Sequence, residues 1–259
     1  MALITFMSDF GNSDHYVVAV KAVMLRINPG LHIVDISHEI ELYDLAHASH
    51  VLGSVFRNFP EGTIHIVAVD SVGDPGTKFI AAKLEGHYFI CSDSGLISLI
   101  SEKEPAMVSE LFDVDNLEGT NFPARDILAK AAAMLAGGSG LEDIGKYTSE
   151  YKRLIPRRFR ATKKQISGHV IRVDHYGNLI TNIEEEVFNI LRKDRNYTVA
   201  IGREKVTKIN RLLNEVDNGD CFVIFNSSGK LEIGLKRGRA SDLMGLGYDS
   251  PIHIMFEEE

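Results

Sequence analysis

Short apolar runs alternate with stretches of helical periodicity along the first half of the chain. The apolar runs are rich in β-branched residues, and they predict strands at residues 3–7, 32–36, 63–69, 88–91 and 96–100. Between them, apolar residues recur every three or four positions and predict helices at residues 16–27, 42–56 and 124–135. This alternation is typical of parallel strands joined by crossover helices, so an N-terminal α/β domain with a mostly parallel sheet is predicted.

The second half of the chain has a different pattern, in which turn signals separate short strand candidates. The candidates span residues 167–173, 179–183, 197–201, 221–225 and 231–235. Dipeptides such as Asn218-Gly219 and Ser228-Gly229 favour tight turns between them. With one helix predicted at residues 184–192, the pattern fits a small β-barrel or sandwich of roughly 90 residues.

A basic segment separates the two patterns. Between Glu150 and Lys164 the chain has seven Lys or Arg residues and a single Glu. An anion-binding strip and a solvated connector both fit, and a connector is favoured because runs of charge usually lie on exposed surface. We therefore predict an α/β domain at residues 1–150, a basic linker at residues 151–166 and a C-terminal β-barrel domain at residues 167–259.

Charge and composition narrow the class of protein. The 259 residues carry a formal charge of −8, which argues against binding of nucleic acid over the whole surface. Cys91 and Cys221 lack the spacing of a zinc site or a disulfide framework. The first residues have no basic region like that of a secretory signal, and no apolar run approaches the ~20 residues that cross a bilayer. A cytoplasmic protein without a membrane or nucleic-acid partner is expected.

Acidic residues follow three of the predicted strands. Asp9, Asp70 and Asp93 each come just after an apolar run, and ligands of open parallel sheets bind outside the carboxyl ends of the strands. A carboxylate there can accept hydrogen bonds from two ribose hydroxyls, which makes Asp9 a candidate sugar ligand. The alternative for Asp9 is an Asx-turn or the N-cap of the helix that begins at Tyr16.

Other catalytic patterns have less support. Asp44, His47 and His50 recur at three-residue spacing on a predicted helix, but positions six apart drift off one face, so no metal site is predicted. The chain has neither a phosphate-binding G-x-x-x-x-G-K-[ST] loop nor a G-x-G-x-x-G motif. It also has no G-x-S-x-G elbow, so a covalent serine nucleophile is unsupported.

Two polar turns interrupt the strands of the second half. Residues 174–178 have the sequence D-H-Y-G-N, and residues 226–229 have the sequence N-S-S-G. Each fits an ordinary hairpin turn. Together they also offer a carboxylate, an aromatic ring, an amide and a hydroxyl, which suit a zwitterionic amino acid beside a flat ring.

Several stretches in the same order resemble a known family, the S-adenosylmethionine (SAM) hydroxide adenosyltransferases, whose relatives include fluorinases and chlorinases. The similar stretches are F-M-S-D-F-G at residues 6–11, I-V-D-I-S-H at 33–38, F-P-E-G-T at 59–63, D-S-G-L at 93–96, F-P-A-R-D at 122–126, G-N-L-I-T-N at 177–182 and N-S-S-G at 226–229. The resemblance covers essentially the whole chain, and several motifs in one order are far more specific than any one of them.

The resemblance implies an α/β domain followed by a β-barrel, and a homotrimer that binds SAM between one subunit's first domain and its neighbour's second. Position by position, it implies that Asp9 holds the ribose hydroxyls and that Tyr43, Ser94 and Phe122 contribute to the nucleoside pocket. It further implies that Asp174 and Ser227 bind the methionine amine and carboxylate, and that Tyr176 and Asn178 contact the adenine. In the family, a nucleophile displaces methionine at the ribose 5′ carbon, and no cofactor takes part.

The catalytic positions depart from the family pattern. The hydrolytic members use an Asp, an Arg seven positions later and a His in an F-H-G-R-D motif. Asp70 matches the first position, whereas Thr77 stands at the Arg position and Pro123 at the His position. Lys78 offers a positive charge beside Thr77, as a point charge without the planar fork of Arg.

These residues favour an enzyme that hydrolyses SAM to adenosine and methionine, with Asp70 and Lys78 as the catalytic residues. One alternative is a family member that has lost turnover and binds SAM or adenosine as a sensor or scaffold. Another is a chlorinase-like variant that uses a halide. Fluorination is least favoured, because the short connection at residues 83–88 lacks the inserted loop of the fluorinases.

Overall fold

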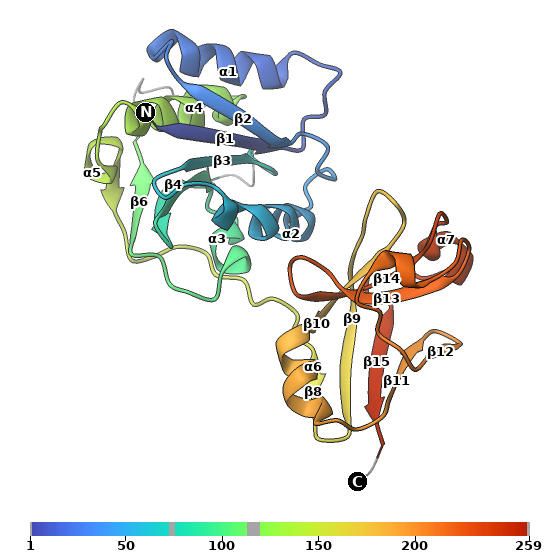
Figure 1. The fold of residues 1–259 in the computed structure, drawn as a ribbon. Coiled ribbons are helices and arrows are strands. Elements are labelled where there is room, and N and C mark those ends of the chain that lie inside the picture. The colour runs from blue at the N-terminus through green and yellow to red at the C-terminus, as the bar shows by residue number, and fades with distance from the viewer. Residues whose placement is uncertain (1, 73–75, 113–119, 258–259) are drawn as a thin grey trace. The chain divides into compact units, whose positions relative to one another are not determined.

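The chain folds into two compact units, Met1–Pro156 and Arg157–Glu259 (Figure 1). The computed structural model describes residues 2–72, 76–112 and 120–257. Each unit has its own hydrophobic core. No helix in these ranges combines the length and the apolar character that a membrane span requires.

The first unit is built on a seven-stranded sheet in the order β2-β1-β3-β5-β4-β6-β7. The bounds of its strands are β1 Leu3–Ser8, β2 His32–Ser37, β3 Ile64–Ala68, β4 Phe79–Leu84, β5 His87–Ser92, β6 Met107–Leu111 and β7 Gly145–Tyr147. The neighbours β2, β1, β3 and β5 run parallel, which confirms the predicted α/β class. The sequence pattern missed β4, β6 and β7, which continue the sheet in antiparallel pairs.

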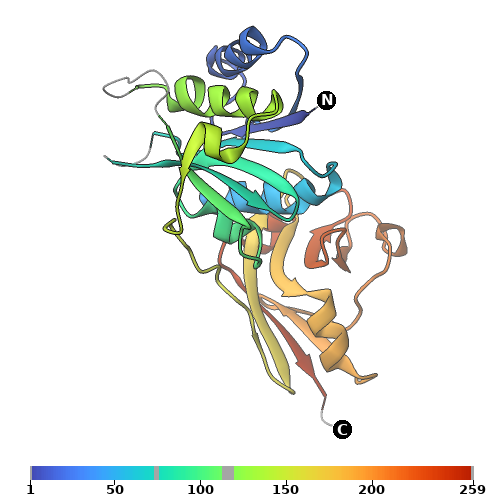
Figure 2. The same cartoon turned by 90° about the vertical axis from the view of Figure 1, so that its left-hand side faces the viewer.

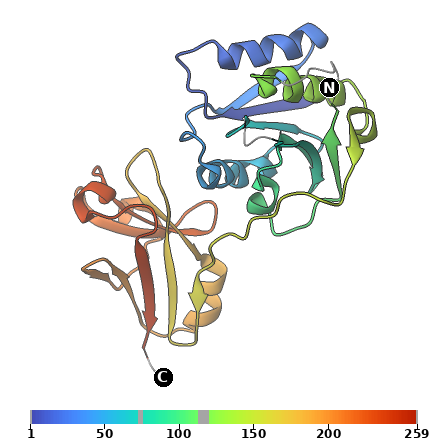
Figure 3. The same cartoon turned by 180° about the vertical axis from the view of Figure 1, so that it is seen from behind.

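Helices cover both faces of this sheet. Helices α1 (Tyr16–Ile27) and α4 (Ala129–Ala136) lie on one face, and α2 (Leu45–Val55) and α3 (Leu96–Ile100) lie on the other (Figures 1 and 3). In the view turned by 90°, α1 and α4 again lie together over the same face (Figure 2). Alternate residues of each strand point to opposite faces of the sheet. Ile66 packs with the residues of α1 and α4 on one face, and Val67 packs with those of α2 on the other. Each layer thereby encloses a separate apolar core.

The prediction of a strand at residues 96–100 is wrong. These residues form the short helix α3, which follows Gly95 in a left-handed conformation at φ 97°. Leu96, Ile97 and Ile100 are buried against the α2 layer. A short apolar run has the same composition in a buried strand and in a buried helical turn, so periodicity could not separate the two.

The second unit is an eight-stranded antiparallel, barrel-like sheet. Seven strands follow the order β12-β11-β15-β9-β10-β14-β13, and β8 pairs with β9. Their bounds are β8 Arg160–Ala161, β9 Gln165–Val173, β10 Leu179–Glu184, β11 Tyr197–Ile201, β12 Glu204–Val206, β13 Cys221–Phe225, β14 Lys230–Leu235 and β15 Pro251–Phe256. Helix α6 (Glu185–Arg192) packs Phe188 into the core, and α7 (Ala240–Met244) buries Ala240 there. The barrel-like architecture confirms the predicted fold of the C-terminal half.

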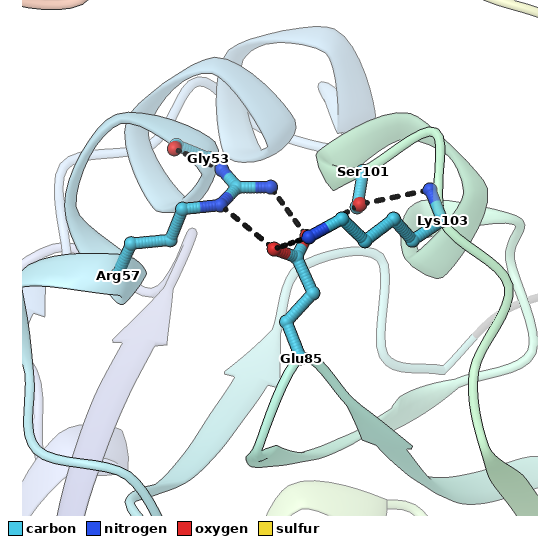
Figure 4. Close-up of polar contacts among 5 residues, drawn as sticks. All are labelled: Gly53, Arg57, Glu85, Ser101 and Lys103. Atoms are coloured by element: carbon cyan, nitrogen blue, oxygen red, sulfur yellow. Dashed lines mark hydrogen bonds and ion pairs between the residues drawn. The ribbon is translucent and has the colours of Figure 1, made fainter.

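Glu85 gathers three donors at the β4–β5 turn, as Figure 4 shows. Its carboxylate accepts hydrogen bonds from Arg57 Nη2 at 2.5 Å, Ser101 Oγ at 2.6 Å and Lys103 Nζ at 3.0 Å. The side chain is only 12% exposed, and Arg57 also stacks on the Phe56 ring at 4.2 Å. The Arg57 hydrogen bond is the largest influence on this carboxyl and lowers its pKa to about 2. The cluster ties the β4–β5 turn to the 3₁₀ turn Phe56–Asn58, which follows α2, and to the segment after α3.

We expect Glu85→Gln to lower the free energy of unfolding by about 2 kcal/mol at pH 7, because charge-assisted hydrogen bonds are lost. The carboxyl has a lower pKa in the folded state than in the unfolded one. Its contribution is therefore fully present above about pH 4.5 and is lost as the pH falls toward about 2. Urea denaturation of both proteins between pH 7 and pH 2 measures this, with Glu142→Gln on the exposed side of α5 (Leu141–Ile144) as the control. A difference between wild type and Glu85→Gln that stays constant down to pH 2 would contradict the expectation.

Candidate active site

The carboxyl ends of three parallel strands carry the acidic residues that the sequence singled out. Asp9 follows β1, Asp70 comes two residues after β3, and Asp93 follows β5. Since β1, β3 and β5 are adjacent and parallel, all three residues lie at the same edge of the sheet. This edge is where open α/β sheets bind ligands.

Asp9 connects two segments that are distant from it in sequence. Its side chain is buried at 8% exposure, and Oδ2 accepts hydrogen bonds from the backbone N–H of Tyr43 at 3.0 Å and of Asp70 at 3.2 Å. These partners are 34 and 61 positions away, so Asp9 is not the centre of a local Asx-turn. It does not cap α1 either, because the N-cap residue is His15 and no side chain caps that helix. The structure therefore brings together three residues that were predicted as site residues.

Both residues that Asp9 holds have unusual backbone conformations. Tyr43 has a φ of 63° and Asp70 a φ of 49°, in the left-handed region that residues with a Cβ rarely adopt. Such conformations cost of order 1–3 kcal/mol each and persist where surrounding contacts impose them. The Tyr43 side chain is 71% exposed, which leaves its ring available to a ligand. One oxygen of Asp9 therefore stabilises the backbone at Tyr43 and Asp70, whether or not the side chain also binds a ligand.

Ser8 and His38 fix the backbone next to Asp9. Ser8 Oγ lies 2.7 Å from His38 Nδ1, and the Gly11 N–H donates to the His38 carbonyl at 2.8 Å. Asp35 lies 3.1 Å from His38 Nε2 and also pairs with Lys21 at 2.5 Å. Ser8 is completely buried, so this Ser-His-Asp set has no exposed nucleophile.

Asp44 and His47 on the predicted histidine-bearing helix have structural roles. Asp44 caps α2 by accepting from Ala46 N and His47 N, and His47 Nδ1 accepts from Glu41 N at 3.0 Å. Within residues 2–72, 76–112 and 120–257, no three His, Cys, Asp or Glu side chains are grouped as metal ligands.

An aromatic cluster contains Phe122. Its ring centroid lies 5.8 Å from that of Phe10 and 5.6 Å from that of Tyr16, at edge-to-face angles. Arg125 stacks over Phe122 at 5.2 Å and bonds Asp126, whose pKa that hydrogen bond lowers. Pro123 immediately precedes a π-helical turn, Ala124–Leu128, that continues into α4. These flat faces can stack on a purine or a ribose.

Lys78 and Ser94 lie near the same edge of the sheet with partners of their own. Lys78 is 54% exposed and its Nζ pairs with Glu110 at 2.7 Å; this hydrogen bond raises the pKa of the ammonium. Ser94 is buried and lies 3.5 Å from the Ser92 carbonyl. Asp93 accepts from Lys152 N at 2.8 Å, which fixes the start of the basic segment.

In the second unit, the predicted residues 174–178 form a tight turn between β9 and β10. Asp174 accepts from Asn178 N at 2.8 Å and from Asn178 Nδ2 at 3.3 Å. Gly177 adopts a φ of 81°, and a Cβ there would collide with Arg239. Tyr176 is 73% exposed at the tip of the turn. Asp174 and Asn178, implied for amine and adenine binding, are therefore held by one local network.

The predicted residues 226–229 form the turn between β13 and β14. Asn226 Oδ1 accepts from Ser228 N at 3.0 Å and from Lys230 N at 3.1 Å, and Ser227 is exposed. Glu232 on β14 links this turn to the previous one, because it accepts from Asn226 Nδ2 at 3.1 Å and from Asn178 Nδ2 at 2.9 Å. Glu232 is not among the residues predicted from the sequence. Its signal was the alternation in K-L-E-I-G-L, which places Glu232 on the face opposite the buried Leu231 and Ile233.

The two units define the class of protein as an α/β unit with a strand-end carboxylate site followed by an antiparallel barrel-like unit. The chain belongs to the SAM hydroxide adenosyltransferase family, since it matches the N-terminal domain of that family over residues 4–145 and the C-terminal domain over residues 168–253. The resemblance seen in the sequence motifs is thereby confirmed.

Several similar proteins match nearly the whole chain. The (R)-S-adenosyl-L-methionine hydrolases of Methanocaldococcus jannaschii and Thermus thermophilus are each 29% identical; the matches cover 98% of this chain and 96% and 100% of the relatives. A fluorinase of an Actinoplanes species is 27% identical over 70% of this chain and 71% of its own. The crystal structure of a conserved protein from Thermotoga maritima superposes with a TM-score of 0.89 at 33% identity, covering 98% of this chain and all of that one.

Proposed function

We propose that this protein hydrolyses SAM to adenosine and L-methionine. The observation that carries the proposal is the Asp9 carboxylate, which joins Tyr43 and Asp70 at the carboxyl ends of β1 and β3 in a chain of this family. Relatives that match nearly the whole chain carry the name of this hydrolase. Two observations bear on the alternatives: a fluorinase matches 70% of this chain, and Thr77 and Pro123 stand at two catalytic positions of the family. The hydrolases match 98% of the chain, so hydrolysis is favoured.

The reaction suits a site without a cofactor. Water attacks the ribose 5′ carbon, a C–O bond forms, and the C–S electron pair returns to the sulfonium sulfur, which leaves as the neutral thioether of methionine. The attacking water loses one proton. Alignment of the water behind the carbon and exclusion of bulk solvent lower the barrier, and a carboxylate beside the water can accept the proton. In this proposal Asp70 is that carboxylate.

The two carboxylate oxygens of Asp9 have different tasks in this proposal. Oδ2 accepts the two backbone N–H groups, and within the described ranges no hydrogen bond engages Oδ1. Oδ1 is left to accept from the ribose hydroxyls, while Tyr43, Ser94 and Phe122 line the nucleoside pocket. Asp174 and Ser227 bind the amino-acid end, and Tyr176 and Asn178 contact the adenine. A homotrimer, whose neighbouring subunits complete each site, and a cytoplasmic location are part of the same proposal.

Incubation of the purified protein with SAM tests the function. Adenosine, 5′-chloro-5′-deoxyadenosine and methionine are followed by chromatography with and without chloride. Both sulfonium epimers are used, since the relatives' names specify the (R) form. Equal release of adenosine and methionine supports the proposal. Chlorinated product would identify a halogenase, and tight binding by calorimetry without any product would identify an inactive binder.

Lys78 is proposed as the charge that replaces the missing Arg. We expect Lys78→Met to lower kcat about tenfold and to leave KM for SAM within about twofold, because the charge would act on the transition state more than on bound substrate. Glu110→Gln is the matched control, because it removes the ion-pair partner and keeps the ammonium. An unchanged kcat in Lys78→Met would restrict Lys78 to its surface pair with Glu110.

A further inference from the structure

Glu232 lies at the centre of a hydrogen-bond network that joins two turns of the second unit, at residues 174–178 and 226–229. Both turns carry residues that are proposed to bind SAM. One carboxylate oxygen accepts from Asn178 Nδ2 at 2.9 Å, and the other accepts from Asn226 Nδ2 at 3.1 Å. Asn178 ends the turn that begins at Asp174, and Asn226 begins the turn that carries Ser227. Two turns 48 positions apart in the sequence are therefore held by one side chain on β14.

The orientation of both amides is fixed by their other contacts. Asn226 Oδ1 already accepts from two backbone N–H groups, so its Nδ2 must face Glu232. Asn178 Nδ2 lies between Glu232 and Asp174, and only a donor fits between two carboxylates. Gly234 closes the remaining side, because a Cβ there would collide with Asn178 Oδ1 and the Phe222 ring. Glu232 therefore faces two N–H donors whose orientation is fixed.

We propose that Glu232 is the positioning residue that sets the distance between the amine-binding Asp174 turn and the carboxylate-binding Ser227 turn, and so determines the affinity for the amino-acid end of SAM. The inference rests on the proposed function of these turns. Glu232 acts through Asn178 and Asn226 and does not itself contact the substrate. A carboxylate suits this task because each of its two oxygens accepts from a different amide, whereas the side chain of Gln has a single acceptor oxygen.

An exchange of side chains tests this role. Glu232→Gln leaves one oxygen for two donors and sets its own amide nitrogen against one of the asparagine amides. We expect it to raise KM and the dissociation constant for SAM about tenfold and to change kcat at saturation by less than about twofold. Asn226→Asp alone places two carboxylates together, and we expect a similar loss of affinity.

The double variant Glu232→Gln with Asn226→Asp restores complementarity. The new amide on β14 would accept from Asn178 through its oxygen and donate through its nitrogen to the new carboxylate in the β13–β14 turn. The other oxygen of that carboxylate keeps the two backbone donors, and the net charge equals that of the wild type. We expect KM to return to within about threefold of the wild-type value. Glu184→Gln is the matched control, since Glu184 pairs with Lys230 Nζ on the same β10–β14 ladder, whereas the network uses only the backbone N–H of Lys230.

The outcomes separate this inference from the function on which it rests. Failure of the wild type to bind SAM by calorimetry would refute both. Binding by the wild type without rescue in the double variant, or an unchanged KM in Glu232→Gln, would refute the positioning role alone. Thermal melting of every variant identifies loss of fold. If the single substitutions only weakened the fold, they would lower the melting temperature, and the double variant would not regain affinity for SAM.

Discussion

Asp9→Asn is expected to lower kcat/KM for SAM on the order of 100-fold with little loss of stability. The asparagine oxygen can take the place of Oδ2 and keep the N–H groups of Tyr43 and Asp70 satisfied. Its amide nitrogen then replaces the oxygen proposed for the ribose, and an amide N–H cannot accept from a hydroxyl. A lost hydrogen bond to a charged group costs about 1.5–3 kcal/mol, and each 1.4 kcal/mol corresponds to a factor of ten.

Asp9→Ala separates the two tasks of this carboxylate. It removes the ligand oxygen and also leaves two backbone donors without their acceptor. We expect a similar loss of kcat/KM together with a decrease of about 1–3 kcal/mol in the free energy of unfolding. Steady-state kinetics and chemical denaturation of both variants measure the two effects. Normal kcat/KM in Asp9→Asn would exclude Asp9 as the ribose ligand.

Asp70→Asn is expected to lower kcat about 100- to 1,000-fold and to leave the dissociation constant for SAM nearly unchanged, because general-base assistance is lost while the binding groups remain. Asn is the right replacement, since Asp70 has a φ of 49° and Asn tolerates this left-handed conformation better than Ala. The backbone N–H that Asp9 accepts also persists in this variant.

Single-turnover release of adenosine, combined with calorimetry, measures both quantities for Asp70→Asn. Asp143→Asn is the control, because Asp143 accepts from Gly140 N at the start of α5 and an amide can keep that bond. A kcat within about threefold of the wild type would remove Asp70 from the chemical step. Loss of SAM binding would show that Asp70 contributes to binding of the substrate and not to the chemical step.

The strand-end site was largely predictable, whereas its internal contacts were not. An acidic residue after an apolar run signals the ligand edge of a parallel sheet, and this rule selected Asp9, Asp70 and Asp93. The family resemblance then singled out Asp70 as catalytic. Turn statistics could not decide between a ligand and an Asx-turn at Asp9. Acceptor contacts 34 and 61 positions away, which no local pattern encodes, exclude the Asx-turn. The role of Asp9 as a ribose ligand stays a prediction.

Elements with a local periodicity could be predicted from the amino-acid pattern. Helix α1 has the predicted bounds, Tyr16–Ile27, because its apolar face repeats at helical spacing over three turns. The parallel strands β1, β2, β3 and β5 follow in the same way from short β-branched runs bounded by turns. The ordered motifs likewise determined the family.

Other features depend on neighbours that are distant in sequence, and they are seen only in the folded chain. Residues 96–100 are helical because Gly95 and the α2 layer accommodate a buried turn there. Strand β4 forms because β5 offers an edge to pair with, and β6 pairs in turn with the free edge of β4. The role of Glu232 can be recognised only in the folded chain, where β14 places it between Asn178 and Asn226. Periodicity records which face of an element is apolar, but the partners of a polar side chain are fixed by packing between segments, and packing is settled only in the folded chain.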